Sequence, residues 1–275
     1  MNLLRCLLTE HDCYKAGRTI VPKGVMIHST GANNPMLRRY VQPAKEDVNY
    51  DGLRNKLGYN SNGNHWNRPG LNACVHAFIG RLADGKVAVV QTLPWNRRGW
   101  HAGQGTTRPS ANNTHIAFEI CEDGLTDSNY FAAVYQEAVE LTAHLCELYG
   151  LDPLEPGVVL CHSEGQRLGM ASNHGDVEHW FPKFGKTMDD FRNHVAAELK
   201  ERREEMTQEQ FNEMMDKWLA QRAAEPASDW SEKERTWMEE MGLIRGDEAG
   251  NRSYKSFCTR EELAAVIYRL EHPED

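Results

Sequence analysis

Residues 131–148 carry apolar side chains at steps of three and four, which predicts a long helix that ends at Gly150. Short runs with the composition of β-strands lie on both sides of it, at 24–30, 73–93, 114–121 and 157–161. The run at 73–93 is divided by Asp84-Gly85, a strong hairpin signal. Strands that alternate with helices are typical of the α/β class. We therefore predict a mixed central β-sheet flanked by helices.

A change in pattern near residue 200 predicts two domains, 1–200 and 201–275. In the first, Thr187 and Asp190 form a capping-box pattern that opens another helix. The charge run 200–206 follows, and three more capping patterns then predict a small all-α module: Thr207–Gln210, Ser231–Glu234 and Thr259–Glu262.

The charge of the chain excludes some partners. The net charge of −9 is concentrated at the end: residues 196–275 carry 20 acidic and 12 basic side chains, whereas residues 1–195 carry 20 and 19. The chain has no basic stripe, so we expect no nucleic-acid partner. No apolar run is long enough to span a membrane, and we expect no membrane insertion. The N-terminus lacks the pattern of a signal peptide, which predicts synthesis and retention in a cytoplasm.

The seven cysteines are odd in number and scattered, with no C-x-x-C spacing. This pattern disfavours a disulfide framework and a cysteine-based structural zinc site. We expect most of them to be small core residues.

Two histidines stand at equivalent places, where the apolar runs 24–30 and 157–161 turn polar. They are His28 and His162, and His174 and Asp176 follow the second one. Strand ends in α/β sheets form clefts where ligands bind. Imidazole and carboxylate groups are zinc ligands, and a catalytic zinc site keeps three protein ligands and one open position. A single strand-end histidine is more often structural, so the pattern suggests zinc and leaves open which residue is the third ligand.

Glu119 lies within the alternating run 114–121, on the same face as His115. A glutamate in a strand is costly unless it is paired, exposed or used in chemistry. Beside a metal it would serve as a general base. His115 shares its face and is a candidate to line the cleft.

The glycine-bounded loop 94–103 offers groups that suit a sugar-peptide substrate. Trp100 and His101 have rings that can stack on sugars, and Arg98 can pair with a peptide carboxylate. Loop tryptophans also serve as lids over a core, so the composition of the loop leaves both roles open.

Several segments of residues 20–195, in this order, resemble the zinc-dependent N-acetylmuramoyl-L-alanine amidases of the amidase-2 type. These segments are "MIHST", "ACVHAFIGRLADGKVAVV", "RGWHAG", "THIAFEICEDG" and "CHSEG…NHGD". Phage endolysins and animal peptidoglycan recognition proteins share this fold. The resemblance implies Zn²⁺ held by His28, His162 and Asp176, with Glu119 as the catalytic glutamate. His174 takes the place of a lysine found in several relatives, and Val75 replaces a tyrosine found in some.

The resemblance implies hydrolysis of the amide bond between N-acetylmuramic acid and the L-alanine of the peptidoglycan stem peptide. It also suggests a phage or prophage endolysin, held in the host bacterial cytoplasm until its release. Residues 237–270 resemble one S-layer-homology unit, which implies either binding to a wall polymer or homodimerisation. Two alternatives are a peptidoglycan-recognition module without catalysis and a cysteine-dependent hydrolase that uses Cys161 beside His162. Adjacent strand residues point to opposite faces, which disfavours the cysteine pair.

Overall fold

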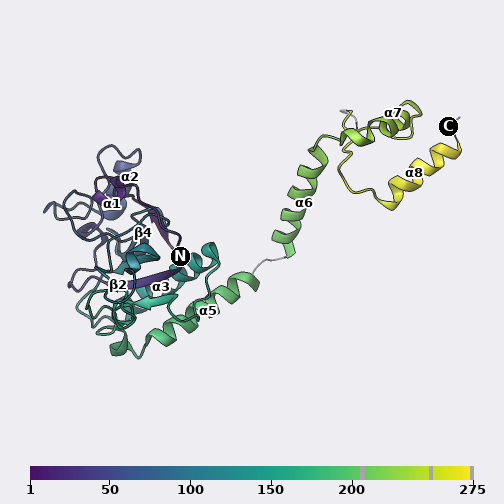
Figure 1. The fold of residues 1–275 in the computed structure, drawn as a ribbon. Coiled ribbons are helices and arrows are strands. Elements are labelled where there is room, and N and C mark those ends of the chain that lie inside the picture. Colours follow the sequence, from purple (N-terminus) through teal and green to yellow (C-terminus); the bar gives the residue numbers. More distant parts are fainter. Residues whose placement is uncertain (205–207, 248–249, 273–275) are drawn as a thin grey trace. The chain divides into compact units, whose positions relative to one another are not determined.

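The computed structural model describes residues 1–204, 208–247 and 250–272, and the chain divides into two compact units, Met1–Arg202 and Arg203–Asp275 (Figure 1). The first unit holds a six-stranded sheet with the order β1-β4-β3-β5-β2-β6. Its strands are β1 (Leu3–Arg5), β2 (Gly24–Ser29), β3 (Ala77–Arg81), β4 (Val87–Gln91), β5 (His115–Ile120) and β6 (Val159–Cys161). Only β3 and β4, the predicted hairpin, pair antiparallel; the other neighbours are parallel. The predicted mixed sheet is confirmed.

Helices flank this sheet, as predicted. They are α1 (Asp12–Lys15), α2 (Tyr50–Leu57), α3 (Ser128–Tyr149), α4 (His162–Arg167) and α5 (Met188–Glu204), with 3₁₀ turns η1 (Leu37–Arg39), η2 (Ala111–Asn113) and η3 (Phe181–Phe184). The helix expected over 131–148 is α3. It starts earlier because the Asp127 side chain accepts hydrogen bonds from the first backbone N–H groups, and it ends at Gly150 in the left-handed conformation (φ 64°).

Alternation along the strands gives the sheet two buried faces. Val25 and Ile27 of β2 face one core, which includes side chains of α3 and α5. Met26 faces the other core, together with Leu53 and Leu57 of α2. The site described below opens on this second face, because His28 follows Met26 by two positions.

The N-terminal residues are part of the sheet, where the sequence pattern indicated no strand. The short strand β1 pairs with β4, with Leu3 opposite Val89. Three residues are too few for an alternation pattern to be visible in the sequence. Among the described residues, none of the helices is both long enough and apolar enough to cross a membrane.

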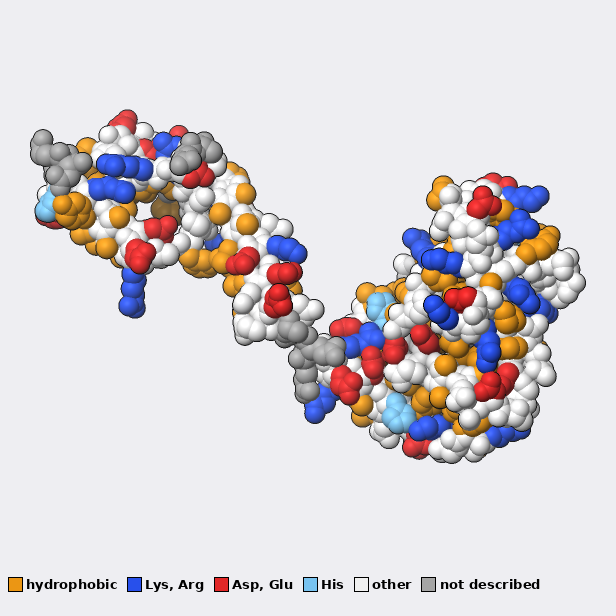
Figure 2. Space-filling model, turned by 180° about the vertical axis from the view of Figure 1, so that it is seen from behind, with side chains coloured by type: hydrophobic (Ala, Val, Ile, Leu, Met, Phe, Trp, Pro, Cys, Tyr) orange, Lys and Arg blue, Asp and Glu red, His pale blue; other side chains and the backbone are white. Residues whose placement is uncertain are grey.

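The second unit is helical in its described residues, as expected. It contains α6 (Gln208–Ala224), η4 (Asp229–Ser231), α7 (Glu232–Glu240) and α8 (Arg260–Glu271). The capping box of Thr259 and Glu262 is formed, whereas Ser231 makes no capping bond and its hydroxyl donates to the Ser228 carbonyl. Thr207, the third expected cap, lies outside the described residues. Many apolar side chains of this unit are exposed, and part of them is visible in Figure 2.

Candidate active site

Three neighbouring parallel strands bring their carboxyl ends to one edge of the sheet. His28 is the second-last residue of β2, and its register partner on β5 is Glu119. His162 comes directly after β6 and is the first residue of α4. Here the chain forms a pocket of about 530 Å³, lined among others by His28, Glu119, His162, His174 and Asp176.

Three side chains meet closely in this pocket. His28 Nδ1 lies 2.9 Å from Asp176 Oδ2 and 3.1 Å from His162 Nδ1. His162 Nδ1 lies 3.3 Å from the same carboxylate oxygen. Both histidines are buried, and Asp176 retains 20% of its side-chain exposure. These residues form a group that could hold a metal ion.

A chain of hydrogen bonds behind His28 fixes its protonation. The His115 carbonyl can only accept, so His101 carries its proton on Nε2, 3.3 Å away. Burial lowers the pKa of His101 well below its usual value, which keeps this ring neutral. His101 Nδ1 therefore accepts from His28 Nε2–H at 3.1 Å. The lone pair of His28 Nδ1 is left facing Asp176 and His162.

Asp176 is held as a carboxylate at neutral pH. Burial acts to raise its pKa, but His162 and His28, both at hydrogen-bonding distance, outweigh burial and lower the pKa of this carboxyl below its usual range. In the metal-free pocket this lowering needs a proton on the histidine side; with the His28 proton on Nε2, where His101 accepts it, His28 Nδ1 and the carboxylate oxygen lie 2.9 Å apart as two electron-pair donors. Two electron-pair donors at this distance repel each other unless a cation lies between them.

Glu119 projects into the same pocket without a partner for one oxygen. Its Oε2 is buried and has no hydrogen-bond partner among the described residues. Burial, with smaller contributions from Asp176 and Glu122, raises the pKa of Glu119 well above its usual value. An unpaired buried carboxyl in a pocket is a candidate proton acceptor for chemistry.

His174 lines the pocket but stays outside the group of three. Its side chain is exposed, and its ring centroid lies 4.6 Å from that of His162. Ser172 Oγ lies between the two rings, 3.2 Å from His174 Nδ1 and 3.4 Å from His162 Nε2. The sequence carried no signal for this serine, since a serine in a glycine-containing loop is commonplace.

Of the candidate substrate-binding residues Trp100, Arg98 and His115, only the first lines the pocket. Trp100 lines the pocket, whereas Arg98 does not: its guanidinium lies over the Trp100 ring and donates to Asn113. His115 is not among the pocket residues either. It is buried at the opposite end of β5, where its ring nitrogens lie 3.0 Å from the Gly157 carbonyl and 2.9 Å from Thr114 Oγ1. Although His115 shares a face of the sheet with Glu119, it does not reach the pocket, because most of the strand separates the two residues.

Cys161 lies apart from the pocket, although His162 follows it directly. The thiol is buried in the core of the first unit, where its sulfur lies 3.1 Å from Ser163 Oγ. Burial raises the pKa of Cys161 to about 11. A nucleophilic cysteine needs an accessible sulfur and a lowered pKa, and Cys161 has neither.

The chain is similar to several solved structures. The Staphylococcus aureus hydrolase AmiA is 16% identical, with a TM-score of 0.47, and the match covers 72% of this chain and 83% of that chain. A mutant of PlyL is 18% identical, with a TM-score of 0.46 and coverage of 71% and 98%. A mutant endolysin from Bacillus subtilis is 18% identical, with a TM-score of 0.43 and coverage of 71% and 99%.

Comparison of the sequence alone gives two further results. No curated protein matches the chain. A family model described as N-acetylmuramoyl-L-alanine amidase matches residues 17–178, a range that includes every residue of the pocket described above. Because this match covers more than half of the chain, the protein belongs to the N-acetylmuramoyl-L-alanine amidase family of peptidoglycan hydrolases.

Proposed function

We propose that this protein uses Zn²⁺ to hydrolyse the amide bond between N-acetylmuramic acid and the L-alanine of the stem peptide. His28, His162 and Asp176 hold the metal, and Glu119 is the general base. The observation that carries the proposal is the meeting of three metal-ligating atoms beside the unpaired Glu119 oxygen in one pocket.

The three residues fit zinc in chemistry and in spacing. Zinc bonds of about 2.0–2.1 Å to nitrogen and oxygen place neighbouring ligand atoms of a tetrahedral site roughly 3.3 Å apart. The corresponding distances here are 2.9, 3.1 and 3.3 Å. The bond from His28 to His101 supplies the outer hydrogen bond that orients metal-ligating histidines. When bound, zinc acts as a Lewis acid that polarises a carbonyl oxygen and makes water easier to deprotonate.

Glu119 moves the proton in this mechanism. It accepts a proton from the attacking water and then returns it to the nitrogen of the leaving L-alanine. A buried carboxyl with a raised pKa can both take up and return a proton near neutral pH. Its unpaired Oε2 leaves one oxygen free for that proton.

The pocket walls suit the sugar-peptide junction of the substrate. Trp66 and Trp100 both line the pocket and offer ring faces to the sugar, and Asn72 offers an amide. His174, which is exposed in the same pocket, is placed to donate to the carbonyl oxygen as negative charge develops. Arg98 acts indirectly, because it lies over the Trp100 ring.

The bond that is cut tests this proposal. Purified peptidoglycan is digested with the protein, and the products are analysed by mass spectrometry. We expect intact stem peptides with a free L-alanine amine, together with uncut glycan strands. New reducing sugar ends, or a free amine on a different residue, would contradict the amidase assignment.

A chelator separates the zinc amidase from the two other candidates. We expect o-phenanthroline to abolish hydrolysis and added Zn²⁺ to restore it, while alkylation of thiols leaves the activity intact. A cysteine hydrolase would respond in the opposite way, and the buried Cys161 argues against it. A recognition module without catalysis would bind peptidoglycan and release no amine. The complete set of His28, His162 and Asp176 argues against that module.

We further propose that the protein is a phage or prophage endolysin whose second unit binds a wall polymer. The support is the resemblance of its sequence motifs. The unit also has exposed aromatic side chains, among them Trp218, Trp230 and Phe257, which suit stacking on sugars. Homodimerisation through the same surface is the rival. Analytical ultracentrifugation, combined with wall pull-down of residues 208–275, distinguishes the two roles.

A further inference from the structure

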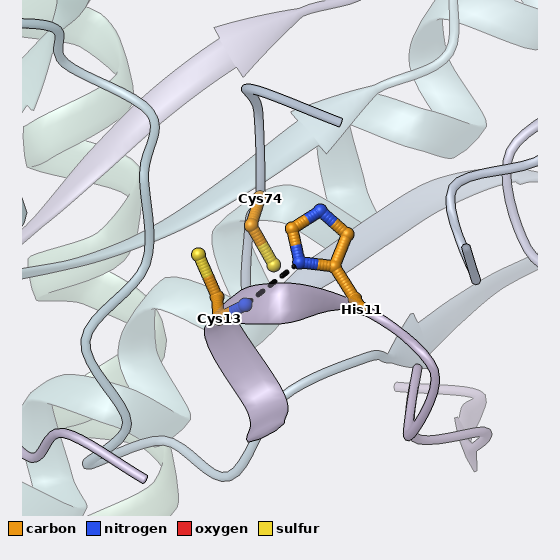
Figure 3. Close-up of side chains that lie close together, drawn as sticks. All are labelled: His11, Cys13 and Cys74. Carbon is orange, nitrogen blue, oxygen red and sulfur yellow. Dashed lines mark hydrogen bonds between the residues drawn. The ribbon is translucent and has the colours of Figure 1, made fainter. Parts of the chain in front are cut away.

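A second group of metal-ligating side chains lies outside the pocket. His11 precedes α1, Cys13 lies within α1, and Cys74 lies shortly before β3. Figure 3 shows that the three side chains lie close together. One ligand atom from each lies within 4.8 Å of the others. His11 and Cys74 are buried, and Cys13 is half-buried.

Hydrogen bonds at both nitrogens hold the His11 ring in place. The Ala73 carbonyl can only accept, so the proton of His11 is on Nε2, which donates to it at 3.0 Å. Nδ1 is therefore unprotonated, and its one lone pair accepts from the backbone N–H of Cys13 at 3.0 Å (Figure 3), so a bound metal would take the place of this hydrogen bond. An imidazole whose second nitrogen donates to a backbone carbonyl is the usual arrangement of a metal-ligating histidine.

Two free thiols complete a set of soft ligands. Cys13 and Cys74 are not joined by a disulfide. Thiolate and imidazole together suit Zn²⁺, whose bonds place sulfur and nitrogen ligands roughly 3.5–3.8 Å apart in a tetrahedral site. The three ligand atoms lie within 4.8 Å of one another, so they would have to draw closer together when zinc binds. These three residues supply three ligands, so a water molecule would complete the tetrahedron.

We propose that His11, Cys13 and Cys74 bind a second zinc ion with a structural role. His11 and Cys13 lie before residues 17–178, the part that matches the family model, and Cys74 lies within it. This site is independent of the proposed catalytic zinc, with which it shares no ligand.

The position of Cys74 indicates what such an ion would stabilise. Its neighbours Ala73 and Val75 both line the active-site pocket. The Cys74 backbone exchanges two hydrogen bonds with Trp100, another pocket residue, at 2.8 and 2.9 Å. A metal at this point would fasten the N-terminal segment to the back of the pocket wall. We therefore expect the ion to hold the wall in place rather than to take part in hydrolysis.

Cobalt distinguishes this site from the proposed catalytic site. Cobalt(II) bound to thiolate gives an intense charge-transfer absorption in the near ultraviolet, and the group of His28, His162 and Asp176 contains no sulfur. The full-length protein is reduced, stripped of metal and titrated with Co²⁺. We expect a thiolate-to-cobalt band that reaches its full intensity by the time two equivalents are bound, because the other equivalent fills the proposed catalytic site. Protein purified with zinc should contain two zinc ions per chain by elemental analysis.

Single substitutions show which cysteines give rise to the thiolate-to-cobalt band. Cys13→Ser and Cys74→Ser should each abolish it, remove one zinc and lower the thermal midpoint of unfolding. Asp176→Ala should keep the band, which separates this site from the catalytic one. Cys258→Ser, at an exposed cysteine of the second unit, should keep both the band and two zinc ions.

Three results would overturn the second zinc site. One is the absence of the band in the reduced wild-type protein, a measurement that needs no variant to fold. The second is a band that survives Cys13→Ser, a change at a half-buried position. The third is a Cys13–Cys74 disulfide that forms in zinc-containing buffer instead of metal binding.

Discussion

His28 and Glu119 are register partners on the adjacent parallel strands β2 and β5. Partners in register project from the same face of a sheet, and both residues line the same pocket. The sheet thereby fixes the proposed metal ligand and the proposed general base relative to each other. Loop movements leave their separation unchanged, which is the arrangement that a proton transfer beside a metal requires.

Glu119→Gln tests the general base. Glutamine keeps the size of the side chain but cannot take up a proton, so we expect kcat on soluble muropeptides to fall by roughly 10²–10⁴. Zinc content should remain unchanged, because Glu119 is not in the group of three ligands. Glu155→Gln, at an exposed loop glutamate, is the control. Full activity of Glu119→Gln would exclude the role.

Two substitutions test the roles of the residues near His162. Asp176 is proposed to bind the metal, and His174 is proposed to stabilise the transition state. Asp176 is within 3.3 Å of both histidines, so Asp176→Ala should lose zinc and activity together. His174 lies outside that group, so His174→Ala should keep most of its zinc while kcat falls by roughly 10²–10³. Atomic absorption on the two purified variants measures the metal. A zinc-free His174→Ala with a loaded Asp176→Ala would mean that the roles are reversed.

His101→Leu tests the hydrogen bond behind the metal site. Leucine cannot accept from His28 Nε2–H, so the His28 ring loses its fixed tautomer and orientation. We expect zinc affinity to fall by roughly 10–100-fold, as is usual for loss of such an outer partner. Competition with a chromophoric chelator gives the dissociation constant. His144→Leu, on α3 and outside the pocket, is the control. Equal zinc affinities for His101→Leu and the wild type would refute this role.

Part of this arrangement was predictable from the sequence. The apolar runs that lead up to His28 and His162 are local patterns, so the sequence predicts where these two strands end and where the edge of the pocket lies. The order β1-β4-β3-β5-β2-β6 was not predictable, because nothing local records that β2 lies between β5 and β6. The bond from His101 to His28 depends on that order and on a loop conformation, and it was therefore missed.

The proposed metal site of His11, Cys13 and Cys74 could not be predicted from the spacing of cysteines along the sequence. The absence of C-x-x-C spacing disfavours a cysteine-based zinc site, but it carries no information on ligands that come from distant segments. Cys74 is brought to α1 by the fold, through the two hydrogen bonds between its backbone and Trp100 and the bond from His11 to the Ala73 carbonyl. A ligand set assembled from distant segments leaves no short motif in the sequence.

Removal of the second unit separates catalysis from wall targeting. Residues 1–204 keep α5 whole and contain every proposed catalytic residue. We expect them to fold and to cleave soluble muropeptides at the full-length rate, but to lyse whole walls more slowly. Turbidity of a wall suspension gives the lysis rate. Undiminished wall lysis by residues 1–204 would leave the second unit without a targeting role.

His76 makes the stability of the first unit depend on pH. It is fully buried, Nδ1 accepts from the Ala117 N–H at 3.0 Å, and Nε2 lies 2.6 Å from the Arg97 carbonyl. Burial lowers the pKa of His76 to about 4. The folded protein therefore keeps this ring neutral at pH values where an unfolded chain, with an ordinary pKa of about 6.5, takes up a proton.

The sign of the effect follows from which state binds the proton. Above about pH 6.5 neither state is protonated at His76, and the stabilising contribution is fully present. As the pH falls toward 4, the His76 ring binds a proton in the unfolded state but not in the folded state, so the free energy of unfolding decreases. At pH 5 this loss amounts to about 2 kcal/mol. Urea denaturation of metal-free protein at pH 7.5 and 5.0 measures it. His76→Gln, whose amide can make both hydrogen bonds, should show a decrease that is smaller by this amount; an equal decrease in the two proteins would contradict the prediction.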